Sequence, residues 1–126
     1  ERAQIDFTYK IDVPAEFEQA KDFGFATMLS NLLENAFIAV CKVPDSQERK
    51  VSVRIEPKKE QLIIEIRNNY FGKLDISRET GLPVTDKVDG HGYGLVSVSN
   101  YARKSGALLK FRPEGQLLVV QYITNL

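Results

Sequence analysis

The spacing of apolar residues changes along this chain from a strand period to a helix period. Near the start, apolar residues alternate with mostly polar ones and the run ends at Pro14, which predicts a strand with one buried face. These residues are Ile5, Phe7, Tyr9 and Ile11. From about residue 22 to 43 the spacing becomes three or four, and Pro44 ends the pattern. The helical stripe comprises Leu29, Leu32, Leu33, Ala36 and Val40. Such a chain needs a sheet with a helix packed on it.

The rest of the chain repeats this alternation. Two short alternating runs around the turn PKKEQ predict a hairpin at the centre of the sheet. Its apolar positions are Val51, Val53, Ile55, Leu62, Ile64 and Ile66. A second helical face begins near Leu95 and ends at Gly106, which stands where a C-terminal cap glycine belongs. Residues 107–122 predict another hairpin around the turn PEG.

These elements predict an α+β fold in one domain, residues 1–126. We expect a two-layer sandwich in which a mixed sheet of about five strands has both helices on one face. Residues 70–90 show no sustained period and read as one long loop over an edge of the sheet. With 126 residues and 14.3 kDa, the chain is large enough for a single core.

Composition excludes several classes of function. Seventeen basic and seventeen acidic residues give no net charge, so we expect neither nucleic acid nor a membrane surface as a partner. The single Cys41 excludes an internal disulfide, and we find no secretory signal and no apolar run that would span a membrane. These features favour a reducing, cytoplasmic setting. We also expect a domain excised from a longer protein, because the chain opens with Glu1 rather than Met and its first strand pattern begins within a few residues.

The segment GHGYGL, Gly90 to Leu95, is a candidate anion site. Closely spaced glycines before a helix let backbone amides and the helix dipole approach a polyphosphate. No GK[ST] follows, which excludes a Walker loop, and Ser97 occupies the place of the third glycine of a dinucleotide fingerprint. The protein-kinase motifs VAIK, HRD and DFG are also missing, so another nucleotide fold is required.

Asn31 and Asn35 lie four residues apart in the first helix and therefore share one face. Asparagine is a slightly unfavourable choice inside a helix, which suggests a function beyond a solvated helix flank. The side-chain oxygen of Asn35 is a suitable ligand for Mg²⁺, whose remaining ligands are usually waters and phosphate oxygens.

Three motifs together resemble the nucleotide domain of sensor histidine kinases. LSNLLENAF (29–37) is similar to their N box, IEIRNNYFG (64–72) to their D box and HGYGL (91–95) to their final G box. The resemblance extends to the superfamily shared with gyrase, heat-shock chaperones and mismatch-repair proteins, known as GHKL. Within it the chain looks most like the accessory-gene-regulator type of peptide quorum-sensing kinase. The implied fold is the Bergerat-type sandwich with an ATP lid loop, here from about Lys73 to Gly90.

The resemblance implies a role for each matching residue. Asn35 would coordinate Mg²⁺, Asn31 would assist the phosphates or metal-bound waters, and Asn68 would face the adenine amine. Gly72 would allow close approach of the base or ribose. Gly92 and Gly94 of the G box would lie beside the phosphates. Their neighbours Leu95 and His91 would also belong to the nucleotide site, His91 as a lid or cap residue. Lys87 and Arg78 of the lid would close over the terminal phosphate, with solvated loop charges as the equal alternative.

Departures from the family pattern change what is expected of the chemistry. Asn68 replaces the usual Asp, so its hydrogen bond to adenine loses charge assistance worth roughly 1 kcal/mol. Tyr70 replaces the first glycine of the D box, and Ile38 replaces a phosphate-binding Lys. Asn31 stands where gyrase-like members carry a catalytic Glu, and an amide cannot accept a proton near neutral pH. We therefore expect negligible ATP hydrolysis.

The sequence thus predicts a catalytic domain that binds MgATP for transfer to a histidine on a separate phosphoacceptor domain, in the same or a partner protomer. A response regulator would act downstream, and this fragment would not touch the membrane directly. The alternative is a degenerate nucleotide-sensing or interaction module without phosphotransfer, motivated by Asn68 and Tyr70. A serine-directed anti-sigma kinase of the same superfamily is a third reading.

Overall fold

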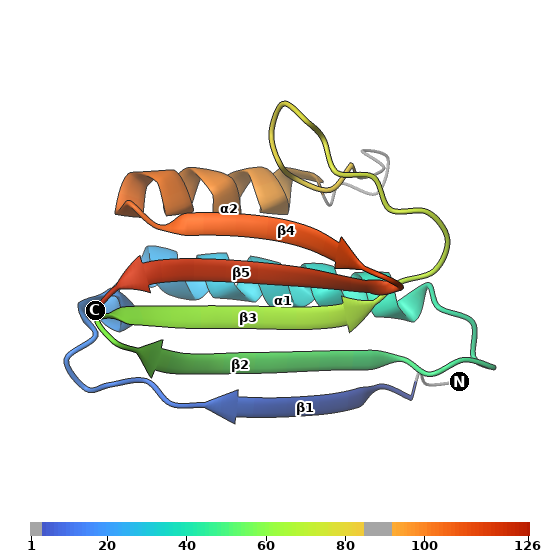
Figure 1. The fold of residues 1–126 in the computed structure, drawn as a ribbon, viewed down its shortest axis with the longest axis horizontal. Coiled ribbons are helices and arrows are strands. Elements are labelled where there is room, and N and C mark those ends of the chain that lie inside the picture. Colours follow the sequence, from blue (N-terminus) through green and yellow to red (C-terminus); the bar gives the residue numbers. More distant parts are fainter. Residues whose placement is uncertain (1–3, 85–91) are drawn as a thin grey trace.

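A computed structural model describes residues 4–84 and 92–126 of the chain (Figure 1). The elements in chain order are β1 (Asp6–Ile11), the short 3-10 helix η1 (Glu18–Lys21), α1 (Phe23–Cys41), β2 (Lys50–Lys58), β3 (Gln61–Asn69), α2 (Gly92–Ser105), β4 (Leu108–Glu114) and β5 (Leu117–Asn125). The expected α+β sandwich is confirmed, because five strands form one sheet and Figure 1 shows α1 and α2 behind the same face of it.

The strand order in the sheet is β1-β2-β3-β5-β4. β1 runs parallel to β2, and all other neighbours are antiparallel, so the sheet is mixed as predicted. The two predicted hairpins are the pairs β2–β3 and β4–β5. β3 is the central strand and carries four inward-facing residues at alternate positions: Leu62, Ile64, Ile66 and Asn68.

Helix α1 begins where the sequence supplies a cap. Oδ1 of Asp22 accepts a hydrogen bond from the backbone N–H of Gly24 at 3.0 Å, which satisfies one of the unpaired donors of the first turn. The buried stripe of α1 comprises Phe25, Met28, Leu32, Ala36 and Val40. The predicted stripe is therefore only partly right, since Leu29 and Leu33 flank this line and are half-buried. Cys41 is an exposed thiol at the end of the helix.

By length and composition alone, the 19-residue α1 is apolar enough to cross a membrane, with a mean hydropathy of 1.3 over an 18-residue window. This departs from the expectation that the chain has no such run. The observation is weak evidence for a membrane span, because a helix that packs in the core of a domain passes the same test. Here the stripe of α1 belongs to the hydrophobic core under the sheet.

The prediction that β1 has one buried face is wrong. All six residues of β1 are exposed, including Phe7, Tyr9 and Ile11. The side chains of these three residues lie on the helix side of the sheet, since their partners are the core residues of β2. β1 is the outermost strand, however, and the helices pack against the strands further in. The alternation of apolar and polar residues therefore predicted the strand. It did not predict that the helices leave this strand uncovered.

Helix α2 starts at Gly92, a turn earlier than the apolar pattern from Leu95 indicates. Gly106 follows it with φ +72°, a conformation that favours glycine, and this confirms the predicted C-terminal cap. At the same end of the sheet, η1 is tied to β5. The buried hydroxyl of Tyr122 donates to Oε1 of Gln19 at 2.9 Å, and Nε2 of Gln19 donates to Oγ1 of Thr124 at 2.7 Å. Burial raises the pKa of Tyr122 to about 12.

Candidate functional site

The structure brings Asn31 and Gly94 together, although 62 residues separate them in the sequence. A β-carbon placed on Gly94 would lie 3.8 Å from Cγ and 3.9 Å from Oδ1 of the Asn31 side chain. Asn31 lies in the middle of α1, and Gly94 lies in the first turn of α2. The first turn of a helix presents unpaired backbone N–H groups and the positive end of the helix dipole. The side-chain amide of Asn31 therefore lies beside a helix start whose backbone N–H groups can bind an anion.

Asn68 supplies the clearest sign that a ligand belongs in this region. Its side chain is 1% exposed on the inner face of β3, and its Nδ2 donates to the backbone oxygen of Asn69 at 3.1 Å. Oδ1 of Asn68 is buried and has no hydrogen-bond partner among residues 4–84 and 92–126. A buried acceptor without a donor costs about 1–3 kcal/mol of stability. A ligand that presents an N–H group to this oxygen would recover that free energy.

Asn35 is half-buried one turn further along α1 than Asn31, as the four-residue spacing predicts. Among the residues that the structure describes, no group of three or more His, Cys, Asp and Glu side chains is placed to hold a metal ion. Glu34, next to Asn35, is exposed. Any Mg²⁺ at Asn35 would thus depend on amide oxygen, water and phosphate, a ligand set that this cation commonly takes.

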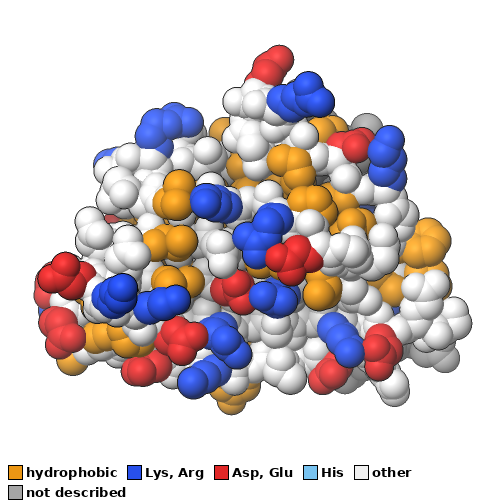
Figure 2. Space-filling view, in the orientation of Figure 1, with side chains coloured by type: hydrophobic (Ala, Val, Ile, Leu, Met, Phe, Trp, Pro, Cys, Tyr) orange, Lys and Arg blue, Asp and Glu red, His pale blue; other side chains and the backbone are white. Residues whose placement is uncertain are grey.

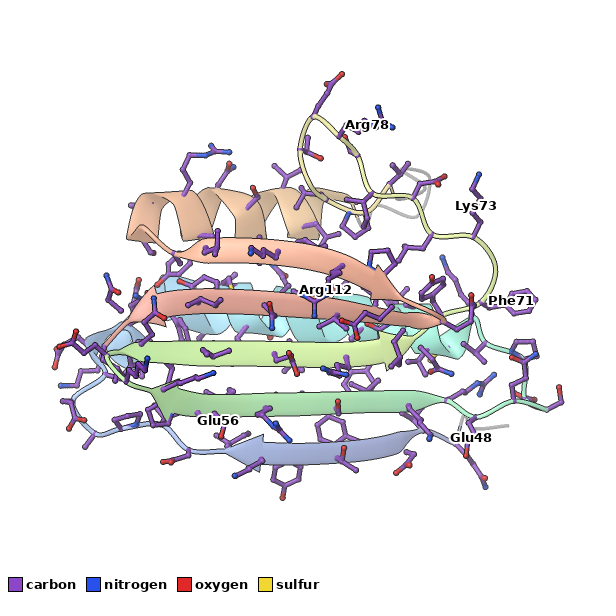
Figure 3. All side chains as sticks on the ribbon, in the orientation of Figure 1. Glu48, Glu56, Phe71, Lys73, Arg78 and Arg112 are labelled. Atoms are coloured by element: carbon purple, nitrogen blue, oxygen red, sulfur yellow. The ribbon has the colours of Figure 1, made fainter. Side chains whose placement is uncertain are left out.

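The chain after β3 forms an ordered turn over residues 75–84, within the predicted lid. Ile76 and Pro83 form an isolated antiparallel bridge, and the Val84 N–H donates to the Asp75 oxygen at 2.8 Å. Figure 3 shows Arg78 near the tip of this turn and Lys73 at its base, both pointing away from the sheet. Gly72 has φ +83°, so the turn after β3 favours glycine there, whatever its role toward a ligand.

The structure places only some of the remaining predicted site residues. Lys87 and His91 lie outside the described residues. Gly92 is the first residue of α2, where its backbone belongs to the helix start. The side chain of Leu95 is 2% exposed and belongs to the hydrophobic core.

Tyr70 has a structural partner that the sequence comparison with the D box did not suggest. Its hydroxyl donates to the backbone oxygen of Gly115 at 2.9 Å, and its backbone oxygen accepts from Nε2 of Gln116 at 3.0 Å. These bonds tie the end of β3 to the β4–β5 turn. The neighbouring Asn69 is also structural, because its Oδ1 accepts from the Lys50 N–H at 2.8 Å. Of the two adjacent asparagines, only Asn68 faces the inner side of the sheet.

A hydrogen bond links the two helices that carry Asn31 and Gly94, and the sequence analysis missed it. The hydroxyl of Tyr101 on α2 donates to Oδ2 of Asp22, the N-cap of α1, at 2.8 Å. That bond, together with the Gly24 N–H, lowers the pKa of Asp22 below its usual 3.8. Burial and the bond to Asp22 raise the pKa of Tyr101. Asp at a helix start was the available signal for the cap, but nothing local indicated its partner.

The open face of the sheet has a different character. A hollow of about 540 Å³ lies there, lined by polar and charged residues of β1, β2 and β3 such as Lys10, Arg54 and Glu65. Figure 2 shows basic and acidic side chains intermixed over this face. None of the predicted site residues lines the hollow. The candidate site therefore lies on the helix side, where Asn31, Gly94 and Asn68 are found.

The sequence comparison decides the family. Residues 21–124 match the family model described as a GHKL domain. The chain belongs to the GHKL family. No curated protein matches the chain in sequence.

Solved structures with this GHKL fold include the histidine kinase domain of the Erythrobacter litoralis EL346 blue-light activated histidine kinase. It is 19% identical with a TM-score of 0.71, over 99% of this chain and 53% of that chain. The catalytic domain of the histidine kinase ThkA is 17% identical with a TM-score of 0.66, over 96% of this chain and 78% of that chain. The GHKL chain thus spans about half the length of the Erythrobacter structure. These likenesses show the fold of histidine kinase catalytic domains.

Proposed function

We propose that this GHKL domain binds ATP with Mg²⁺ and presents the γ-phosphate to a histidine on a separate phosphoacceptor domain. The observation that carries the proposal is the buried Oδ1 of Asn68, for which the described part of the chain supplies no donor. The exocyclic amine of adenine is such a donor. The family match supports the same assignment. So does the position of the Asn31 amide near Gly94, in the first turn of a helix suited to phosphate.

The orientation of the Asn68 amide also favours adenine over guanine. Its Nδ2 is engaged by the backbone oxygen of Asn69, so Oδ1 is the atom left for the ligand. Guanine carries an oxygen where adenine carries its amine, and two acceptors would face each other. We therefore propose discrimination against GTP, although the neutral amide makes a weaker bond than a carboxylate would.

The phosphate end of the site rests on α1 and α2. Asn35 would hold Mg²⁺ through Oδ1, and the cation would neutralise phosphate charge during transfer. Asn31 would orient the phosphates or metal-bound waters, and the backbone of Gly92 to Leu95 would contact phosphate oxygens. Gly72 would leave room for the base or ribose. Arg78, Lys87 and His91 would belong to the lid that closes over the nucleotide.

The chemistry proposed is transfer rather than hydrolysis. Asn31 lies beside the start of α2, where an attacking water would need a general base, and an amide cannot serve as one. Catalysis would then consist mainly of positioning and charge stabilisation, with the acceptor histidine on another domain. The domain by itself should phosphorylate no residue of its own, His91 included.

The wider setting is also a proposal. A histidine kinase of the accessory-gene-regulator type would use this domain in two-component signalling, with a response regulator receiving the phosphoryl group. The domain would then be cytoplasmic and belong to a membrane-anchored receptor. The motif pattern of the N, D and G boxes supports this subfamily. Lid closure over ATP would complete the site.

Titration calorimetry with ATP and Mg²⁺ tests the nucleotide assignment. Asn68→Leu removes the acceptor and fills the space with an apolar group, so ATP affinity should fall about tenfold. Asn125→Ala is the matched control. Asn125 is an exposed asparagine at the last position of β5, whereas Asn68 pairs with the first residues of that strand. Unchanged ATP affinity in Asn68→Leu would contradict the proposed base contact.

A second measurement separates a kinase from an interaction module that has lost transfer. The domain is incubated with labelled ATP and a histidine-bearing phosphoacceptor domain, and acid-labile phosphate on that domain is measured. Transfer that disappears in Asn35→Ala supports the kinase. No binding heat at millimolar nucleotide would instead support the degenerate module, and stable phosphohistidine at His91 would overturn the assigned acceptor.

A further inference from the structure

We infer that β1 is a self-association edge, at which two copies of this chain pair their β1 strands antiparallel and join two sheets into one. The two-fold axis passes beside Thr8, so that residue faces its own copy. The inference is independent of the nucleotide site. It rests on an exposed strand edge, on the apolar side chains along it and on the charges that one register brings together.

The two edges of the sheet differ in how they are protected. β4, at one edge, contains Pro113, and proline is a common device that blocks pairing with another chain. β1, at the other edge, contains neither a proline nor a bulge, and it pairs with β2 in continuous register over six residues. Figure 1 shows no labelled element beyond β1 on its outer side. β1 thus presents a regular edge that neither a proline nor a bulge interrupts.

Backbone hydrogen bonds show which peptide groups face outward. The N–H of Asp6 donates to the Arg49 oxygen at 2.7 Å, and the N–H of Asp12 donates to the Ile55 oxygen at 2.8 Å. Even-numbered residues of β1 therefore point their backbone groups at β2. The alternation of a strand then directs the N–H and C=O groups of Phe7, Tyr9 and Ile11 to the free edge. In an antiparallel pair, these odd-numbered residues must bond to one another.

The side chains on the helix side of this edge are apolar and poorly covered. Phe7 is 43% exposed, Tyr9 68% and Ile11 57%. The ring of Phe7 stacks with that of Tyr9 at 5.8 Å between centroids and contacts the ring of Phe37 on α1 at 5.6 Å. A second copy would extend this aromatic row across the dimer axis. Burial of such a row is the main driving force available to the edge.

Within the six residues of β1, one register of the side chains on the open face pairs opposite charges. With Thr8 opposite Thr8 of the second copy, Phe7 faces Tyr9, and Asp6 faces Lys10 twice by symmetry. Lys10 is free to accept this partner, since its contact with Glu56 is a 3.8 Å ion pair whose Lys side chain is 71% exposed. Figure 3 shows Glu56 on β2 beside this edge strand. Directly opposed unlike charges stabilise an antiparallel pair.

The neighbouring registers of the β1 pair bring together less favourable charges. A shift that places Tyr9 opposite Tyr9 brings Asp6 against Asp12 at two places. A further shift places Lys10 opposite Lys10. A shift the other way, with Phe7 opposite Phe7, removes every charge pair within β1. Like charges opposite each other destabilise strand pairing, so the register with Thr8 at the axis is specified by side chains and not by the backbone alone.

Sedimentation and light scattering of the 126-residue chain test whether the dimer forms. The mass should rise from 14.3 kDa toward twice that value between about 1 μM and about 1 mM, a range typical of weak specific association. Over the same range, amide exchange at Phe7, Tyr9 and Ile11 should slow, because these N–H groups become bonded only in the dimer. A monomer throughout, or no concentration-dependent protection at these amides, overturns the inference.

Charge exchange tests the register. Asp6→Lys places Lys against Lys, and Lys10→Asp places Asp against Asp, so each variant alone should weaken the dimer about tenfold. An equimolar mixture of the two variants pairs opposite charges again and should form a heterodimer. Lys110→Asp is the control, since Lys110 lies on the open face of β4 at the other edge. Dimers that persist in both single variants, or a mixture that stays monomeric, contradict this register.

Discussion

The hydroxyl of Tyr101 donates a hydrogen bond to Oδ2 of Asp22 at 2.8 Å, and this bond links the two helices of the GHKL domain. Asp22 also caps α1 through Oδ1, which accepts from the Gly24 N–H. One carboxylate therefore fixes the start of α1 and its position relative to α2. Because Asn31 and Gly94 lie on these same helices, the contact helps to set the distance between the proposed metal-side amide and the proposed phosphate-binding turn.

Asp22→Asn should lose stability only where the carboxylate is charged. The hydrogen bond from Tyr101 and that from the Gly24 N–H lower the pKa of Asp22 in the folded state below 3.8. Its contribution is therefore present above the unfolded pKa and lost as pH falls through the folded pKa. Urea unfolding of both proteins should show a constant difference at neutral pH that shrinks below about pH 4.

Tyr101→Phe provides the matched test of the cause. Without the hydroxyl, the pKa of Asp22 should rise toward its usual value, which can be followed by NMR titration of the carboxyl carbon. A pKa that does not move would show that the Gly24 N–H, and not Tyr101, sets the charge state of Asp22.

Two glycine substitutions should have opposite effects. A β-carbon on Gly24 would lie 2.9 Å from Cε1 of Tyr101, so Gly24→Ala must displace the ring and should cost about 1–2 kcal/mol. A β-carbon on Gly94 has only ordinary contacts with Asn31, and alanine is the better helix former, so Gly94→Ala should leave stability equal or raise it by up to about 1 kcal/mol. Thermal unfolding measures both changes.

Gly94→Ala should weaken ATP binding even though it does not destabilise the fold. Gly94→Ala adds a methyl group beside the proposed phosphate position, so ATP affinity should fall about tenfold although the fold is intact. If Gly94→Ala binds ATP as the wild type does, the phosphate does not approach the backbone of Gly94.

Asn68→Asp should trade stability for affinity. A buried carboxylate would face the backbone oxygen of Asn69, to which Nδ2 of Asn68 now donates, so the unliganded domain should lose about 1–3 kcal/mol. The same carboxylate would accept a charge-assisted bond from adenine, and ATP should bind about fivefold more tightly. Unfolding with and without ATP measures both effects, and weaker ATP binding together with intact fold would exclude an adenine amine at this position.

Asn35→Ala should weaken ATP binding only when Mg²⁺ is present. Loss of the proposed ligand oxygen should reduce affinity about tenfold in Mg²⁺ and leave it unchanged in chelator, because without the cation Asn35 has no role in the site. Glu34→Ala, on the exposed side of the same helix turn, is the control. Equal losses with and without Mg²⁺ would indicate a direct phosphate contact instead.

Local patterns were sufficient for most of the secondary structure. Alternation identified β2 and β3, and the same period places Asn68 on the inner face after Ile64 and Ile66. The cap at Gly106 follows from its positive φ, which few residues other than glycine adopt. These features depend on neighbours within a few residues, and the sequence by itself determined them.

Other features depend on segments that meet only in the folded chain. β1 is exposed because the helices do not cover it. The residues of β1 themselves do not determine where the helices pack. The closeness of Asn31 to Gly94 and the bond of Tyr101 to Asp22 both depend on how the two helices pack against each other. The sequence determined which side chains were available, because periodicity is local. Only the tertiary structure decided which of them meet, because packing is not local.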